Sequence, residues 1–407
     1  MAPKPNKNSS KLIKDIKLNS LLGITKAINN NYSTSQLLEI FKEVLETKLK
    51  IGKLVLFSNS EGGWQCILKY GVADEYNDID VVRDLLPITE IGTINFSNKT
   101  LNKSFEILIP VFHKSQPLAY VLIGDLDDKV ELSPAIKHLN FVQTLTSIIV
   151  VAIENKKLAK ESIRQAALKK ELELASEMQA MLFPSSLPNN AQLDAAAFYL
   201  PHQQVGGDYY DFIWLHESEF AFCVADVSGK GVAAALLMSN FQANLRVLLN
   251  HTASLTELVQ ELNTKVMASA KGEKFITLFI AKYNLITHTL TYINAAHNPP
   301  LLASKNSVSA LKIGCTGLGM FDEIDRIKEG VLTISDAASI ICYTDGLVEL
   351  ENDLEEDYGI HSLKELIKNN SHLDMKGMNE LIMETIVTYK QSQPYFDDIA
   401  LFSLRIH

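Results

Sequence analysis

A long stretch without glycine or proline most constrains how this chain can fold. Residues 151–183 are rich in Lys, Glu, Ala, Leu and Gln, and the first helix breaker after them is Pro184, followed by Pro188. These residue types favour the helix, so the stretch predicts one continuous α-helix that stops at the prolines. With 407 residues in all, the chain is long enough for two domains. We therefore expect a helical linker over residues 156–183 between an N-terminal and a C-terminal domain.

The same stretch carries an imperfect heptad pattern. Alternate steps of four and three residues reach ten positions, of which six are apolar: Val151, Glu154, Leu158, Glu161, Gln165, Leu168, Leu172, Ala175, Gln179 and Leu182. This pattern predicts a short parallel coiled coil, and hence a homodimer through the linker and the N-terminal domain. A solvent-exposed spacer helix is the alternative interpretation.

The N-terminal part has the pattern of an α+β domain over residues 18–155. Apolar residues recur at helical spacing over 18–49, with Ser33 to Ser35 as a cap before a second helix. Before this domain, the basic and polar residues 1–17 are expected to be flexible. Four β-rich runs and a closing helix are then predicted at 53–57, 64–71, 105–112, 118–126 and 141–155.

This order resembles a GAF domain, on LLGITKAI near its start, on the hairpin IPVF…LAYVLIGDL and on the exit helix. The resemblance implies a regulatory module that binds a small ligand or mediates dimerisation. Cys66 falls inside a predicted strand, so we interpret it as a buried thiol rather than a chromophore or redox site.

In the C-terminal part, residues 184–407, aspartates follow β-rich runs. EFAFCVAD (219–226) predicts a strand that ends in an acid, and the glycine-containing turn SGKG leads into a helix over 232–249. Such a turn can present the Asp226 carboxylate together with the Val227 carbonyl. The lysine is not part of a phosphate-binding P-loop, because Gly231 follows it where Ser or Thr is required.

Three further motifs repeat the placement of acids at strand ends: GGDYYD (206–211), SIICYTDG (339–346) and YFDDIALFSLRI (395–406). A sheet or sandwich that gathers these ends would bring Asp208, Asp226, Asp345 and Asp397 together. Like charges at short range require cations, and oxygen ligands without His or Cys favour Mg²⁺ or Mn²⁺ over zinc. Two such ions can activate a water and clamp a phosphoryl group, so the pattern predicts phosphomonoester hydrolysis.

The motifs VGGDYYD, DVSGKG, NAAHNPPLL, TDGLVE and FDDIALF, in this order, resemble the SpoIIE/RsbU type of PPM (type 2C) serine/threonine phosphatases over residues 170–407. The resemblance implies an αββα sandwich of two antiparallel sheets and two metal ions. It also implies a phosphoserine or phosphothreonine protein as substrate, with a STAS-domain anti-anti-sigma factor expected.

Carried over to this sequence, the resemblance assigns roles to individual residues. Asp226 bridges the ions, and Asp208 holds a metal-bound water, which makes these two the catalytic residues. Asp211 is a weaker candidate for the same role as Asp208. The metal ligands are Asp208, Asp226, the Val227 carbonyl, Asp345 and Asp397, with Asp398 ranked below Asp397 because the doublet aligns to within one residue.

The chain departs from the family pattern in two places. Ala296 stands where NAGHNPPLL has glycine, and beside it we expect His297 to be a hydrogen-bonded structural residue rather than a general acid. No arginine before GGDYYD matches the one that other PPM members use to hold phosphate, so we expect the metals to take more of the substrate binding.

Two other functions compete with the phosphatase. A nucleotide cyclase is suggested by the GAF-like domain and by Gly206–Gly207–Asp208, which echo the start of GGDEF, although the downstream acids are not needed for it. A dimeric sensor with an inactive phosphatase fold is the non-enzymatic alternative, against which the intact acids argue.

Composition narrows the setting. A net charge of −10 argues against nucleic-acid binding, and the longest apolar run, 148–153, is too short to cross a membrane. Four scattered cysteines and an N-terminus without the apolar run of a signal peptide predict a protein of the reducing cytoplasm.

Overall fold

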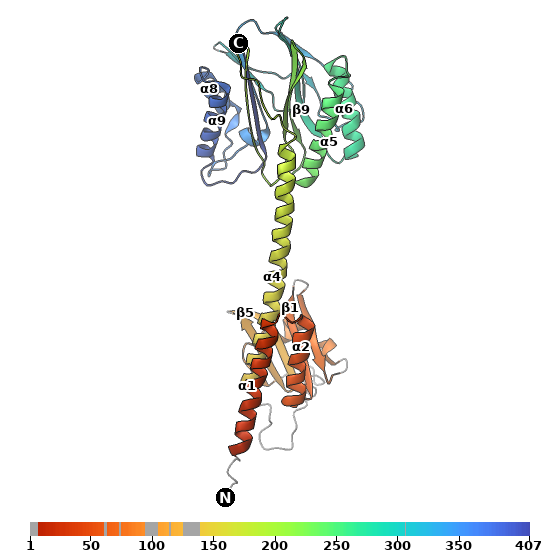
Figure 1. The fold of residues 1–407 in the computed structure, drawn as a ribbon, viewed down its shortest axis with the longest axis vertical. Helices are drawn as coiled ribbons and strands as arrows, with labels where there is room; N and C mark the ends of the chain where they lie inside the picture. The colour runs from red at the N-terminus through yellow and green to blue at the C-terminus, as the bar shows by residue number, and fades with distance from the viewer. Residues whose placement is uncertain are drawn as a thin grey trace. The chain divides into compact units, whose positions relative to one another are not determined.

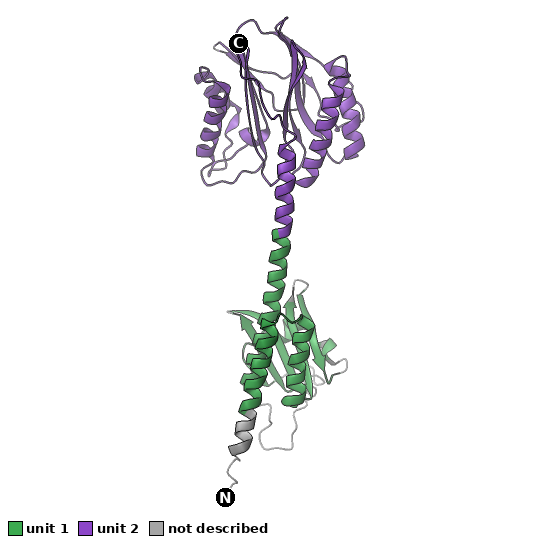
Figure 2. Ribbon diagram, in the orientation of Figure 1, with its two compact units in different colours: residues 1–166 green, residues 167–407 purple. Residues whose placement is uncertain are grey.

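The computed structural model describes residues 7–60, 63–72, 75–93, 105–113, 115–124, 139–305 and 307–407. The chain forms two compact units, residues 1–166 and 167–407 (Figure 2). Each has apolar clusters of its own, so each buries its own core. In the described part of the chain, no helix combines the length and the apolarity needed to span a bilayer.

The N-terminal unit begins with two helices, α1 (Lys7–Asn29) and α2 (Thr34–Glu43), the second continuing into a π-helical turn, η1 (Val44–Lys48). Ser33 caps α2 as expected: its hydroxyl accepts the Gln36 N–H, and the Gln36 side chain accepts the Ser33 N–H. Helices α1 and α2 bury apolar residues such as Ile24 and Phe41 against the sheet.

The sheet of this unit is antiparallel, with strand order β2-β1-β5-β4-β3. Its strands are β1 (Lys53–Ser60), β2 (Gly63–Tyr70), β3 (Gly92–Thr93), β4 (Ile107–His113) and β5 (Gln116–Gly124). A short 3₁₀ helix, η2 (Glu75–Asp78), and a π-helical segment, η3 (Val81–Leu85), lie between β2 and β3. The four predicted strands are confirmed, and β3 escaped prediction because two residues carry no periodicity. That this α+β unit is a GAF domain stays a prediction.

Two expectations for this unit need correction. Helix α1 begins at Lys7, so residues 7–17 are helical where a flexible segment was predicted; residues 1–6 lie outside the described residues. Polar residues do not prevent a helix when its next turns bury apolar side chains. Cys66 is half-buried rather than buried, and its thiol donates to the Leu68 carbonyl.

The predicted closing helix and linker form a single helix, α4 (Leu139–Ala180), of 42 residues. The expected continuity is therefore confirmed, and the helix ends shortly before Pro184. Several apolar side chains on α4 are largely exposed: Leu158, Ile163, Leu168, Leu174 and Met178.

The C-terminal unit is a sandwich of two sheets with two helices on each outer face (Figure 1). One sheet has the order β13-β10-β9-β8-β7, with β14 also paired to β10, and the other has the order β12-β11-β15-β16-β6. Helices α5 (Val232–Leu248) and α6 (Leu255–Ala270) cover the first sheet, and α8 (Gly359–Asn369) and α9 (Met375–Lys390) cover the second.

The strands of the first sheet are β7 (Tyr209–His216), β8 (Glu219–Val227), β9 (Ile276–Asn284), β10 (Thr289–Ala295), β13 (Gly314–Cys315) and β14 (Gly330–Thr333). Those of the second are β6 (Leu193–Leu200), β11 (Leu301–Ser304), β12 (Ser307–Ala310), β15 (Ala338–Tyr343) and β16 (Ile399–Ile406). Aromatic rings fill the space between the sheets, where Phe222 stacks on Phe402 at 5.7 Å between ring centroids. This αββα architecture is the one expected.

Candidate metal centre

Strand pairing brings acids together at one end of each sheet. In the first sheet Tyr209 pairs with Ala225, so Asp208, just before β7, lies beside Asp226, near the end of β8. In the second sheet Tyr343 pairs with Leu401, which brings Asp345 beside Asp397 and Asp398. Asp345 opens the short helix α7 (Asp345–Val348), and the doublet directly precedes β16.

The carboxylates of both sheets act on one another electrostatically. Burial raises the pKa of Asp208 far above its usual range, and the charges of Asp226 and Asp398 add to this rise. The pKa of Asp226 is raised to about 7, first by burial and then by the charge of Asp345. Burial and then the charge of Asp397 raise the pKa of Asp345. The four motifs therefore form one acidic cluster: Asp208, Asp226, Asp345, Asp397 and Asp398.

The cluster suits a hard divalent ion in its chemistry. Asp208 is only 1% exposed, and its Oδ2 atom is buried without a hydrogen-bond partner. A buried carboxylate oxygen in that state is destabilising unless a cation satisfies it. Among the described residues, however, no three acidic, histidine or cysteine side chains are already arranged around a metal position. The donor types and charge fit, while the side chains would have to move to hold an ion.

The two glycines before Asp208 are required by close packing. A Cβ atom at Gly206 would lie 2.2 Å from the Tyr199 hydroxyl and 2.3 Å from Asp398 Oδ2. At Gly207 it would lie 2.9 Å from the Val227 carbonyl oxygen. Only glycine lets this segment approach both the doublet and the carbonyl after Asp226.

The two members of the doublet have different surroundings. Asp398 is buried, and its two oxygens accept backbone N–H bonds from His202 at 2.7 Å and Gly207 at 2.6 Å. The Asp397 side chain is 39% exposed, and its Oδ2 lies 2.8 Å from the Lys230 ammonium. Asp398 thus fixes the backbone around GGD, and Asp397 has the more accessible carboxylate.

Asp211 belongs to a different group of charges. It is fully buried on β7 and forms a bidentate ion pair with Arg246 of α5, at 2.8 and 3.0 Å. The Tyr209 hydroxyl donates to the same carboxylate. These partners occupy both oxygens of Asp211, so the structure does not support its assignment as a holder of metal-bound water.

His297 is buried and bonded through one ring nitrogen, while its Nε2 has no hydrogen-bond partner. It is 5% exposed, its Nδ1 lies 2.8 Å from the hydroxyl of Thr277, and Thr277 pairs with Asp226 across β8 and β9. Burial lowers the pKa of His297 to about 4, so the imidazole is neutral at pH 7. Ala296, which precedes it, has φ of 54°, a conformation that favours glycine.

Sequence reasoning missed two residues, Gln179 in the last turn of α4 and Phe183 just after the helix. Gln179 is buried and bonds to both backbone groups of Gly206: its Nε2 donates to the carbonyl at 2.7 Å and its Oε1 accepts the N–H at 3.2 Å. Phe183 packs on three tyrosine rings, Tyr199, Tyr209 and Tyr210. Gln179 is a polar residue in the heptad pattern, and that was the available signal.

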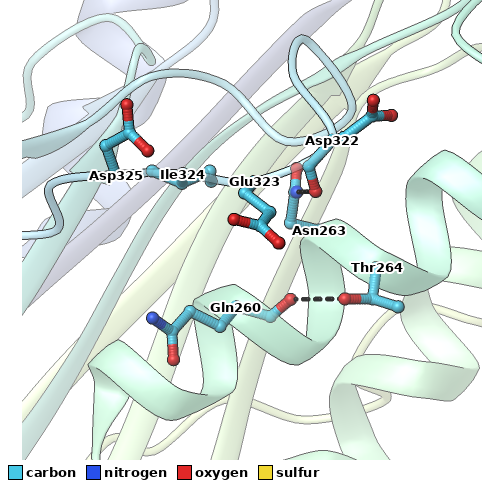
Figure 3. Close-up of a pocket in the computed structure, with 7 residues that line it drawn as sticks. All are labelled: Gln260, Asn263, Thr264, Asp322, Glu323, Ile324 and Asp325. Carbon is cyan, nitrogen blue, oxygen red and sulfur yellow. Dashed lines mark hydrogen bonds between the residues drawn. The ribbon is translucent and has the colours of Figure 1, made fainter.

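A separate acidic pocket of about 450 Å³ lies between α6 and residues 322–325 (Figure 3). Glu323 points toward α6, while Asp322 and Asp325 point away from it. Asn263 holds this segment in place, because its amide donates to the carbonyls of Phe321 and Asp322. None of the five clustered aspartates lines this pocket.

Two packed sheets, antiparallel except for the short parallel pair β10–β13, with paired outer helices and aspartates from four motifs at one end, have the architecture of the PPM (type 2C) phosphatase fold. Residues 216–407 match the family "Stage II sporulation protein E (SpoIIE)" and therefore carry a domain of this family. The C-terminal unit is a SpoIIE/RsbU-type PPM domain. Gly206–Gly207–Asp208 lie just before the matched residues, in the same compact unit.

Individual relatives agree with this assignment. The phosphoserine phosphatase RsbU of Bacillus subtilis is 29% identical over 218 residues, which cover 50% of this chain and 64% of RsbU. Protein IcfG of Synechocystis is 23% identical over 374 residues, covering 82% of this chain and 58% of IcfG. The chain thus spans about three fifths of the length of each relative.

Among solved structures, the SiaA-PP2C domain of Pseudomonas aeruginosa superposes with a TM-score of 0.55 at 17% identity. The superposition covers 60% of this chain and 99% of that domain. This likeness shows the fold of the C-terminal unit.

Proposed function

We propose that this protein is a divalent-ion-dependent protein serine/threonine phosphatase. The observation that carries the proposal is the single acidic cluster assembled from four motifs, in which Asp208 keeps a buried oxygen without a partner. The SpoIIE-family domain and the likeness to RsbU support the same activity.

Two Mg²⁺ or Mn²⁺ ions are the cofactors that we infer. Asp208, Asp226, the Val227 carbonyl, Asp345 and Asp397 would hold them, with Asp398 as the lower-ranked ligand. When bound, such ions lower the pKa of a coordinated water and neutralise a phosphoryl group.

The chain's own residues keep the cluster in place for this reaction. Asp398 accepts N–H bonds from His202, which precedes GGD, and from Gly207 within it, and so fixes the backbone on either side of residues 203–206. Gly207 permits the close approach of the Val227 carbonyl, and the buried, neutral His297 braces Thr277 next to Asp226. A rigid arrangement of this kind reduces the reorganisation required when charge develops on a phosphoryl group.

The substrate that we propose is a phosphoserine or phosphothreonine on a regulatory protein of the cytoplasm. RsbU is described as a phosphoserine phosphatase, which supports a phosphoserine substrate. A STAS-domain anti-anti-sigma factor is the specific partner that we infer from the family resemblance.

Regulation by the N-terminal unit is proposed through α4. The helix belongs to the N-terminal unit at its start and contacts Gly206 through Gln179 near its end. Exposed apolar residues such as Leu158 and Leu168 support a homodimer through this helix. Phosphatase activity of the full chain should therefore differ from that of residues 184–407, and equal activities would remove the support for regulation through α4.

Hydrolysis of para-nitrophenyl phosphate with Mn²⁺ tests the activity itself. We expect wild-type protein to hydrolyse it and Asp226→Asn to lose the activity, because the variant removes the proposed bridging ligand. Equal rates for the two proteins would leave the inactive binding module as the better interpretation. Formation of a cyclic nucleotide product from GTP and Mg²⁺ would instead contradict the phosphatase.

A further inference from the structure

One cation already sits on the acidic cluster. Lys230 lies in the loop between β8 and α5, and its ammonium group is 2.8 Å from Asp397 Oδ2. The same group donates a hydrogen bond to the Phe396 carbonyl. The positive charge of Lys230 also lowers the pKa of Asp345, against the larger effects that raise it. The lysine therefore interacts with two of the proposed metal ligands.

Several other cations of this unit have partners outside the acidic cluster. Lys274, on the other side of the same loop, donates to the Ser228 carbonyl at 2.8 Å. Arg246 is held by Asp211, and Arg405 donates to Ser339 and to the Ser371 carbonyl. Lys230 differs from them because its partner, Asp397, is a proposed metal ligand.

We propose that Lys230 is a built-in counter-ion of the metal centre, which neutralises Asp397 in the ion-free protein and binds the phosphoryl oxygens of the substrate when Asp397 serves as a ligand. The proposal rests on the proposed function. Lys230 would supply a positive side chain for the phosphate, since this chain lacks the arginine that other PPM members use for this purpose.

Lys230 and a bound ion would compete for a single oxygen of Asp397. Asp397 Oδ1 already accepts the backbone N–H of Asp398, so Oδ2 is the oxygen that Lys230 and an ion would contest. Two cations close to one carboxylate repel each other. The lysine side chain is 38% exposed and has a flexible four-carbon stem, so its ammonium group can leave Asp397 and remain at the mouth of the cluster.

A purely structural role would predict different behaviour. If Lys230 only held its loop against Phe396, removal of its charge would lower stability. It would not raise the affinity for ions while lowering the affinity for phosphate. The counter-ion role requires that loss of the charge strengthens ion binding and weakens phosphate binding.

The test uses the full chain with Lys230→Gln, which removes the charge and keeps most of the length. Mn²⁺ binding is measured by calorimetry, and inorganic phosphate is then titrated into the Mn²⁺-saturated protein. We expect Mn²⁺ affinity to rise about twofold to fivefold, within the range of roughly 1.4-fold to fivefold for loss of one exposed ion pair, and phosphate affinity to fall about tenfold. Lys230→Arg keeps the charge and should retain phosphate affinity within about twofold.

Lys305→Gln is the matched control. Lys305 also forms a 2.8 Å ion pair, with Asp336, but near the start of β15, whereas the acids follow the end of that strand. Both affinities should equal those of wild type in this variant. A Lys230→Gln protein with unchanged Mn²⁺ affinity, or with unchanged phosphate affinity, would overturn the proposal.

Failure of the proposed function gives a different pattern. A wild-type protein that binds Mn²⁺ without hydrolysing para-nitrophenyl phosphate would contradict the phosphatase, and the Mn²⁺ and phosphate titrations would still decide the role of Lys230. If Lys230→Gln does not fold, judged by circular dichroism, Lys230→Met repeats the same two titrations with an uncharged side chain of similar length.

Discussion

Replacing Asp226 by asparagine should stabilise the ion-free protein even though it removes the proposed bridging ligand. The pKa of Asp226 is raised from 3.8 to about 7, mainly by burial and by the charge of Asp345. A group whose pKa is higher in the folded protein destabilises the fold as it ionises, so the penalty grows from about pH 4 to pH 7 and is constant above. A shift of roughly three units corresponds to about 4 kcal/mol at full effect.

Asp226 keeps some contact with solvent, so we expect a gain of about 2 to 4 kcal/mol at pH 8. For a domain of this size, that gain raises the melting temperature of the C-terminal unit by roughly 5 to 10 °C. The assay is calorimetric unfolding at pH 8 with a chelator present, repeated at pH 5, where the gain should shrink to under about 2 kcal/mol. Added Mn²⁺ should raise the melting temperature of wild type more than that of Asp226→Asn.

Asp211→Asn provides the matched control. It makes the same chemical change in a buried aspartate outside the cluster that is paired with Arg246. Removing that charge leaves Arg246 without its partner, and we expect a loss of about 3 kcal/mol. If Asp226→Asn melts at or below wild type in chelator at pH 8, the repulsion that we infer within the cluster is not there.

Four further variants test the surroundings of the cluster. Ala296→Gly should raise the free energy of unfolding by about 0.5 kcal/mol, because φ of 54° disfavours alanine. Ala295→Gly, in β10, should lower the free energy of unfolding. Denaturant titration measures both, and a result that places both variants below wild type would contradict the prediction. The pKa of His297 is about 4 in the folded protein and about 6.5 in the unfolded chain. Wild type should therefore lose about 2 kcal/mol of stability between pH 6.5 and 5. Denaturant titration of His297→Asn over the same pH range should not show this loss. Gln179→Ala removes both hydrogen bonds to Gly206 and should lower the stability measured by thermal unfolding by about 1 to 3 kcal/mol. It should also lower kcat/KM for para-nitrophenyl phosphate about tenfold. Full activity would mean that α4 does not position GGD.

Much of the architecture could be predicted from local patterns. The Gly- and Pro-free stretch predicted α4, Ser33 predicted the start of α2, and alternating apolar residues predicted β8 and β16. These features follow from local preferences of backbone and side chains, so neighbouring residues suffice to read them. The placement of acids at strand ends was also a local signal, and the structure bears it out.

The roles of closely spaced acids could not be read in the same way. Asp208 and Asp211 are three residues apart in one motif, yet the first lies just before β7 with the cluster and the second lies within β7 on the side of α5. Side chains alternate between the two faces of a strand, so Asp211 lies on the same face as Tyr209. On that face it binds Arg246, which is 35 residues further along the chain. No local pattern encodes that partner.

The sequence by itself determined the two domains, the helix that joins them and the acids available for an ion, because helix propensity, strand alternation and turn chemistry act over a few residues. Only the tertiary structure decided how those acids are used. Strand pairing between distant segments set Asp398 to fix the backbone of His202 and Gly207 and left Asp397 beside Lys230. Such contacts depend on how the two sheets and their helices pack, and residues more than a hundred positions apart carry no sign of meeting until the chain has folded.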